Sequence, residues 1–371
     1  MKTRNLQISS AGQITGEVQE DISKFDKNFA EAKVGNRSVR YYDALDGPNF
    51  VVTGFPWYKP GGQLVRIPER LLNSDLVNHG VKGLACCTSG GMIRFRTDSE
   101  YVALNAAVQG WEASKSLVGY DIYELVKDKW IFRNVAGPSS AELKAGKFET
   151  LLLSCGCGMR EFLINMPRYG SVSSLKIGLS PEAKLEKPRP WESVKPIVFY
   201  GSSITQGGCA AHPGNNYPAI LSRELSIPQV NLGFSGSAKG EPAMAEAITE
   251  LDMTAFVMEY DHNAPNPEHL KETHAEFFRI IRKAHPKLPI LILTRGDNPD
   301  PERTAVIRAT YDEAVKAGDK HVYFVDGATY FSGLPDPGLA LSDACHPNDF
   351  GFYLMYKAIL PVLKKALAEG E

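Results

Sequence analysis

The chain has 371 residues, of which 43% are hydrophobic and 23% are charged, a composition typical of a soluble globular protein. Its 41 basic against 43 acidic residues give a net charge of -2, which disfavours nucleic acid or an anionic membrane surface as a partner. No apolar stretch reaches the roughly 18–20 residues of a membrane span. The length suits two domains.

The N-terminal stretch 1–21 begins with basic residues but lacks the apolar segment of a signal peptide. The sequence therefore predicts a cytoplasmic protein, or a periplasmic or secreted one if a signal peptide has been removed. We expect the cysteines to be free thiols in a reducing compartment, because none stand in C-x-x-C spacing. They are Cys86, Cys87, Cys155, Cys157, Cys209 and Cys345.

The first half of the chain contains short β-rich runs separated by Gly, Asn, Asp and Pro. This pattern predicts an all-β sandwich or jelly-roll domain over residues 1–185. The runs are 49–58, 61–67, 91–99, 101–108, 129–135, 148–155 and 160–167. Residues 179–196 follow, rich in proline and charge, and are predicted to be a linker.

The second half, residues 194–371, alternates apolar runs with amphipathic stretches. Such alternation indicates a parallel sheet with helices on both faces, a three-layer α/β/α domain. The expected strands are 196–201, 228–234, 254–260, 288–294 and 321–327, and the expected helices are 217–226, 241–251, 267–285, 301–318 and 349–370. In such sheets the active site lies beyond the carboxyl ends of the strands.

Polar motifs stand at these strand ends and near the C-terminus. They are Gly201-Ser-Ser-Ile-Thr-Gln-Gly207, Asn231-Leu-Gly-Phe-Ser-Gly236, Asp261-His-Asn-Ala264 and Asp343-Ala-Cys-His-Pro347. Their order resembles the signature blocks of the SGNH (GDSL-type) hydrolases over about residues 194–368. The resemblance implies a flavodoxin-like sheet and no cofactor. It also implies a nucleophile at Ser203, oxyanion donors at Ser203, Gly236 and Asn263, and Asp343 and His346 as the other triad members.

Chemistry supports the same roles. A serine hydroxyl is a weak nucleophile until a base takes its proton, and a histidine such as His346 serves as that base. Asp343, three residues earlier, can orient the imidazole. Two backbone N–H groups and the Asn263 amide could then stabilise an oxyanion. With a complete Ser/His/Asp set and no metal-ligand cluster, we expect hydrolysis without a metal.

Two departures from the family pattern leave questions open. Ser202 replaces the aspartate of the first block, so either serine could be the nucleophile, and we favour Ser203. Asp261 and Ala264 replace a glycine and an acid in the third block, which brings His262 into the candidate pocket, as a substrate contact or as a structural one. Three further candidate substrate-binding residues are equally explained by loop polarity: His212, Tyr217 and Arg295.

The first half carries Gly119-Tyr-Asp-Ile-Tyr123, which resembles the short G-x-D-L-Y signature of a bacterial β-sandwich domain found ahead of SGNH domains. SGNH proteins with a β-sandwich domain in front resemble carbohydrate esterases, and this resemblance implies a serine esterase that removes short acyl groups, acetyl above all, from a carbohydrate. The alternatives are a lipid or thioester acylhydrolase and a carbohydrate-binding protein with a degenerate hydrolase domain. The expected partner is a small-molecule or carbohydrate ester, with no nucleic acid and no membrane, and an oligomer stays open.

Overall fold

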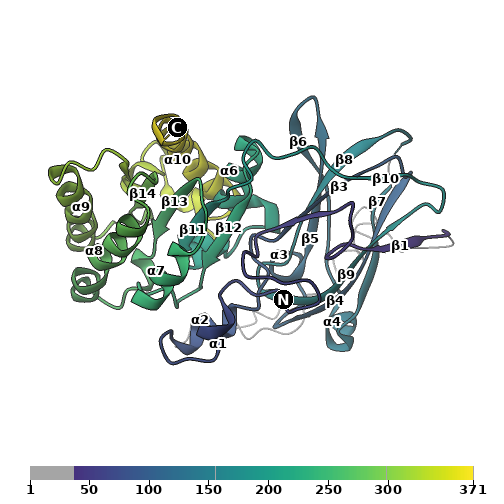
Figure 1. The fold of residues 1–371 in the computed structure, drawn as a ribbon, viewed down its shortest axis with the longest axis horizontal. Helices are drawn as coiled ribbons and strands as arrows, with labels where there is room; N and C mark the ends of the chain where they lie inside the picture. Colours follow the sequence, from purple (N-terminus) through teal and green to yellow (C-terminus); the bar gives the residue numbers. More distant parts are fainter. Residues whose placement is uncertain (1–36, 155, 298, 371) are drawn as a thin grey trace, which may run out of the picture.

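The computed structural model describes residues 37–154, 156–297 and 299–370. The expectation about a signal peptide and the first part of the predicted β-domain fall on residues 1–36, outside this range. Figure 1 shows β-sheets on one side of the molecule and a helix-flanked sheet on the other. Among the described residues, no helix has the length and apolar character needed to cross a membrane.

The first half forms two antiparallel sheets, as the sequence predicts. Their strand orders are β1-β9-β4-β7 and β10-β3-β8-β5-β6, and β2 pairs with β3. The sheets enclose a core of buried apolar side chains that includes Phe95, Leu104, Phe162 and Ile177. The strands are β1 (Arg40–Asp43), β2 (Val51–Thr53), β3 (Met92–Thr97), β4 (Tyr101–Gly110), β5 (Tyr120–Val126), β6 (Lys129–Ala136), β7 (Phe148–Ser154), β8 (Arg160–Asn165), β9 (Gly170–Leu179) and β10 (Leu185–Glu186).

Residues 61–67, expected as a strand, form none. The Arg66 N–H donates to the Ala85 carbonyl at 2.9 Å, next to a short helix, so it does not join a strand ladder. Apolar side chains in this region, such as Ile67, pack on the second half of the chain. The short helices of the first half are α1 (Glu69–Leu72), α2 (His79–Leu84), α3 (Lys115–Val118) and α4 (Ser140–Ala145).

The second half is a five-stranded parallel sheet of order β12-β11-β13-β14-β15, the flavodoxin-like arrangement. Its strands are β11 (Ile197–Gly201), β12 (Gln229–Gly233), β13 (Ala255–Glu259), β14 (Ile290–Leu293) and β15 (Val322–Val325). Its helices are α5 (Ser203–Gln206), α6 (Tyr217–Leu225), α7 (Pro242–Thr249), α8 (Pro267–Ala284), α9 (Pro301–Lys316) and α10 (Asp349–Gly370). The three-layer prediction is therefore confirmed.

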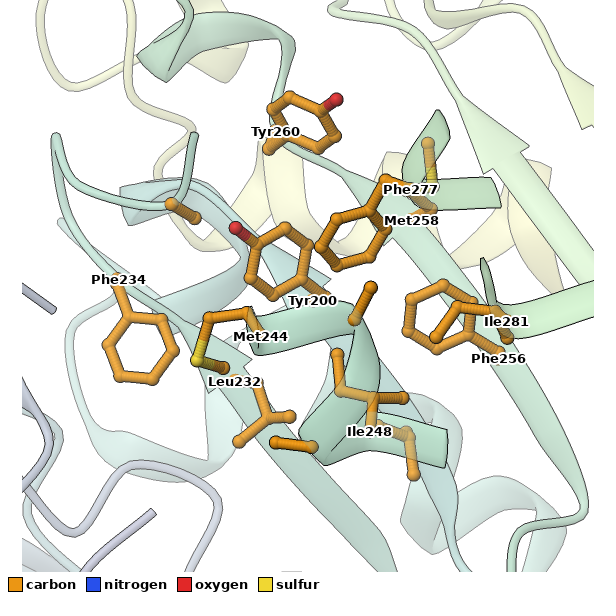
Figure 2. Close-up of a cluster of buried hydrophobic side chains, with 14 of the residues drawn as sticks. Tyr200, Leu232, Phe234, Met244, Ile248, Phe256, Met258, Tyr260, Phe277 and Ile281 are labelled. Atoms are coloured by element: carbon orange, nitrogen blue, oxygen red, sulfur yellow. The ribbon is translucent and has the colours of Figure 1, made fainter. Parts of the chain in front are cut away.

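Strand β11 is buried on both faces, because successive side chains point to opposite sides of a sheet. Val198 and Tyr200 enter the core that contains residues of α7, α8 and α9. Ile197 and Phe199 enter the core that contains residues of α6 and α10. Figure 2 shows the first of these cores, with Tyr200 beside Phe277, whose ring centroid lies 4.6 Å away.

One of the buried apolar clusters spans both halves of the chain. Ile67, Val81 and Leu84 from the first half belong to the same buried cluster as Leu232 and Phe234 from the second. The linker is also packed against the first half, since the Arg94 guanidinium carbon lies 4.1 Å from the centroid of the Trp191 ring. The junction is consequently a buried interface, and the position of the active-site edge depends on both halves.

Candidate active site

A tight turn follows strand β11. A Cβ on Gly201 would lie 2.3 Å from the Glu259 carbonyl oxygen, so only glycine fits where β11 ends beside β13. Ser202 is extended and caps helix α5, accepting the Ile204 N–H at 3.1 Å. Ser203 then opens this one-turn helix.

Ser203, His346 and Asp343 lie in hydrogen-bonding series. The Ser203 hydroxyl is 2.8 Å from Nε2 of His346, and Nδ1 of His346 is 2.9 Å from a carboxylate oxygen of Asp343. The other oxygen of Asp343 accepts the backbone N–H groups of Cys345 and His346, each at 2.7 Å. Burial raises the pKa of Asp343, but these hydrogen bonds outweigh it, and the pKa ends below its usual value. A carboxylate that stays ionised favours the tautomer of His346 with its proton on Nδ1.

The loop that contains Gly236, a predicted oxyanion donor, is tied to the turn of Ser203. The Phe234 N–H donates to the Gly201 carbonyl and the Ser235 N–H to the Gln206 side chain, each at 2.9 Å. Gly236 has a φ of 64°, a left-handed conformation, while a Cβ there would meet nothing within 4 Å. Backbone conformation, and not crowding, therefore explains the glycine. Asn263 donates from its side-chain nitrogen to the Phe234 carbonyl at 2.9 Å, which ties it to the loop that contains Gly236. Its second amide hydrogen remains for another acceptor.

Glu259 supplies a carboxylate beneath the serine turn that sequence reasoning missed. Its side chain is 2% exposed. It accepts the Ser202 hydroxyl at 2.9 Å, the Thr205 hydroxyl at 2.8 Å and the Ser202 backbone N–H at 3.3 Å. Ser202 thus points into the protein toward this carboxylate and away from His346. The sequence does contain a signal for this buried carboxylate. An acid stands at the end of a fully apolar parallel strand, and a charge that is buried there needs a partner.

His262 joins this buried network, so the alternative of a substrate contact is not supported. Its ring nitrogens lie 3.1 Å from Glu259 and 2.6 Å from Asp297. Both nitrogens are therefore occupied, and the side chain is 6% exposed. Burial lowers the pKa of His262, but the hydrogen bonds to Asp297 and Glu259 outweigh it and raise the pKa to about 9.

The other three candidate substrate residues also make internal contacts. Tyr217 is fully buried and its hydroxyl lies 2.8 Å from that of Thr205, so its assignment to the pocket is wrong. Arg295 donates to Asp297 at 2.9 Å. His212 lies 2.5 Å from a carboxylate oxygen of Asp121 through Nδ1.

That contact gives the G-x-D-L-Y-like motif a structural role. Asp121, on β5, is fully buried and also accepts the Gly214 N–H at 2.5 Å. Tyr123, two residues later, donates its hydroxyl to Asn215 at 3.3 Å. The motif of the first half thereby holds the loop 209–216, which directly follows the serine helix.

Two groups of side chains in the described parts of the chain have ligand atoms close enough for a metal ion, within 4.8 Å of one another. His262, Asp297 and Cys345 fit poorly, because burial and the Asp297 charge raise the pKa of the Cys345 thiol to about 12 and His262 is protonated at neutral pH. In the second group Cys209 stands with Asp343 and His346. A cation there would compete for the histidine.

Two family models match the chain. Residues 194–364 match the GDSL-like lipase/acylhydrolase family, and residues 39–185 match the GxDLY domain, the N-terminus of SGNH-hydrolase-type esterases. None of the curated proteins matches significantly.

Solved structures share the fold. A GDSL-like lipase from Bacteroides ovatus, described as putative, aligns with a TM-score of 0.77 and 27% identity over 89% of this chain and 98% of its own. A salicylyl-acyltransferase from a tetracycline biosynthetic pathway gives 0.72 and 19%, over 88% and 97%. An acetyl xylan esterase from Butyrivibrio proteoclasticus gives 0.59 and 12%, over 90% and 100%. The chain is therefore an SGNH-type ester hydrolase, with a GDSL-like lipase/acylhydrolase domain behind a GxDLY N-terminal domain.

Proposed function

We propose that this protein is a serine esterase that removes acetyl groups from a carbohydrate through an acyl-enzyme. The observation that carries the proposal is the hydrogen-bonded series Ser203–His346–Asp343. The Ser203 hydroxyl lies 2.8 Å from Nε2 of His346, and Nδ1 of His346 lies 2.9 Å from the Asp343 carboxylate. No further proton acceptor is needed to activate the Ser203 hydroxyl.

In the first step, the Ser203 oxygen attacks the acyl carbon while its proton passes to Nε2 of His346. Asp343 holds the ring and stabilises the imidazolium. The carbonyl oxygen becomes an oxyanion that accepts from the Ser203 and Gly236 N–H groups and from the free amide hydrogen of Asn263. As the tetrahedral intermediate collapses, His346 returns the proton to the departing alcohol.

In the second step, water enters where the alcohol left and gives a proton to Nε2 of His346. The resulting hydroxide attacks the acyl carbon, the same donors stabilise the oxyanion, and His346 returns the proton to the Ser203 oxygen as the acid leaves. The histidine acts as base and then as acid in each half-reaction, so its ring must keep one orientation. Asp343 ensures this, because it binds both Nδ1 and the backbone N–H of His346.

The carbohydrate acetyl ester is proposed as substrate class because proteins with this two-part fold include an acetyl xylan esterase, although at 12% identity. The test combines labelling with a substrate series. A serine-directed phosphonate should label the peptide that contains Ser203, and Ser203→Ala should lower kcat by about 10³-fold or more. Acetylated sugars should be hydrolysed faster than longer p-nitrophenyl esters. A phosphonate adduct on Ser202, or full activity in Ser203→Ala, would contradict the mechanism, and a preference for long acyl chains would contradict the substrate class.

A further inference from the structure

One loop of the first half lies against the segment that follows the nucleophile. Residues 110–118 connect β4 to the end of α3. Ser116 donates its hydroxyl to the Ala210 carbonyl at 2.7 Å. Arg168 is fully buried and donates both to the Ser116 hydroxyl at 2.8 Å and to the Ala210 carbonyl at 2.5 Å. The loop is thus fixed next to the residues that follow α5.

Tyr169 extends this contact to the catalytic groups. Its N–H donates to the Leu117 carbonyl at 2.9 Å. Burial raises the pKa of Tyr169, and the side chain of Ser235, the neighbour of Gly236, lies close enough to the Tyr169 hydroxyl to lower that pKa in part. A methyl group built on Gly208 would lie 3.1 Å from that hydroxyl and 3.4 Å from a ring carbon of His346. Tyr169 therefore reaches the space between the oxyanion loop and the histidine.

Trp111 covers the outer side of Tyr169. The two ring centroids are 5.9 Å apart, and Tyr169 is 8% exposed whereas Trp111 is 73% exposed. An aromatic side chain of this size with most of its surface in water can bury that surface against a bound ring. None of the contacts within the described residues requires an indole at this position, since Tyr169 is already buried and its N–H is bonded to the Leu117 carbonyl.

We propose that Trp111, backed by Tyr169, is the platform on which the sugar ring of the substrate stacks while its ester lies at Ser203; this rests on the function proposed above and names the part of the site that binds the alcohol. The β-sandwich half thereby supplies the substrate specificity and the α/β half supplies the reacting groups. A pyranose presents several C–H bonds on one face. These C–H bonds are attracted to the negative face of an indole ring, and stacking of the two rings buries apolar surface on both partners.

The test measures three acetyl esters on wild-type protein, Trp111→Ala and Trp111→Phe. Ethyl acetate has no ring to stack on the platform, phenyl acetate offers an aryl ring, and an acetylated methyl xylopyranoside offers a pyranose. Trp111→Ala should lower kcat/KM for the pyranoside by about two- to tenfold, the range of one aromatic stacking contact, mainly through KM. Its kcat/KM for ethyl acetate should stay at the wild-type value, and Trp111→Phe, which keeps a ring, should restore most of the loss.

The remaining outcomes overturn the platform. A loss on phenyl acetate without a loss on the pyranoside would assign Trp111 to an aryl group. Equal losses on all three esters would show a structural role, and equal rates in all three proteins would show none. If the wild-type protein hydrolyses ethyl acetate but not the pyranoside, the sugar platform is overturned and the esterase activity still stands. Wild-type protein inactive on every ester would overturn the proposed function together with it.

Discussion

Replacing His262 by glutamine should remove a pH dependence from the free energy of unfolding. The His262 ring lies between the carboxylates of Glu259 and Asp297, at 3.1 and 2.6 Å, and is almost completely buried. The folded protein therefore binds a proton on this ring more tightly than the unfolded chain does. Glutamine can bridge part of the same gap but carries no titratable proton in this range.

The size of the effect follows from the two pKa values. The pKa of His262 is about 9 in the folded protein and about 6.5 in the unfolded chain. Its stabilising contribution is complete below pH 6.5, because both states are then protonated and the native ion pairs are formed. Between pH 6.5 and 9 the unfolded chain loses its proton first, so stability falls as pH rises. The full span of about 2.5 pKa units corresponds to about 3 kcal/mol.

The assay is chemical denaturation of both proteins at pH 6, 7, 8 and 9, with the free energies of unfolding subtracted at each pH. Subtraction cancels other groups that titrate in this range, such as Cys86, whose pKa a hydrogen bond from Cys87 lowers to about 6. The advantage of wild type over His262→Gln should shrink by about 3 kcal/mol from pH 6 to pH 9. A difference that stays constant with pH would show that folding does not raise the pKa of His262, and an advantage that grows with pH would show that the folded protein holds the ring neutral.

Two further results are expected. Ser202→Ala should lower the free energy of unfolding by about 1–2 kcal/mol, because it removes a helix cap and one donor to Glu259. Its kcat should fall far less than that of Ser203→Ala, and an equal loss of kcat would mean that Ser202 is the nucleophile. EDTA should leave ester hydrolysis unchanged and added zinc should inhibit it through Cys209, Asp343 and His346, with Cys209→Ser less sensitive; activation by zinc would contradict both expectations.

The parallel sheet was predictable because its strands are buried on both faces and appear in the sequence as short, continuous apolar runs. Three of the four site motifs were recognisable because they follow such runs at the same edge of the sheet, and the Asp343–Pro347 motif was recognisable by its resemblance to a family block. The supports of these motifs were only partly predictable. Glu259 ends a fully apolar strand, which signals burial, but only the packing around β13 shows that Glu259 and Asp297 balance His262. Tyr217 was misplaced because a tyrosine that contacts substrate at a helix start and one that bonds a buried hydroxyl look alike in sequence.

Arg66 shows why the packing between the two halves was also hidden in the sequence. Its guanidinium is fully buried and donates to carbonyl oxygens on both sides, of Leu84 and Cys87 in the first half and of Asn231 and Gly233 in the second. Burial lowers the pKa of Arg66 to about 10, which still leaves it charged at neutral pH. Backbone acceptors leave no trace in a sequence, so an arginine in a loop gave no sign that it joins the two halves.

This packing predicts that the chain cannot be reduced to its α/β half. Without residues 61–91, Leu232, Phe234 and Met244 would lose the apolar neighbours that they have in the shared core, and the carbonyls of β12 would lose Arg66. Cutting a protease site inserted between residues 187 and 188 should therefore leave both fragments co-eluting on gel filtration with ester hydrolysis retained. Separating the fragments in denaturant and refolding 188–371 alone should abolish hydrolysis of ethyl acetate, a substrate too small to need Trp111. Full activity of that isolated fragment would show that the first half contributes binding only and that the shared core is dispensable for the catalytic edge.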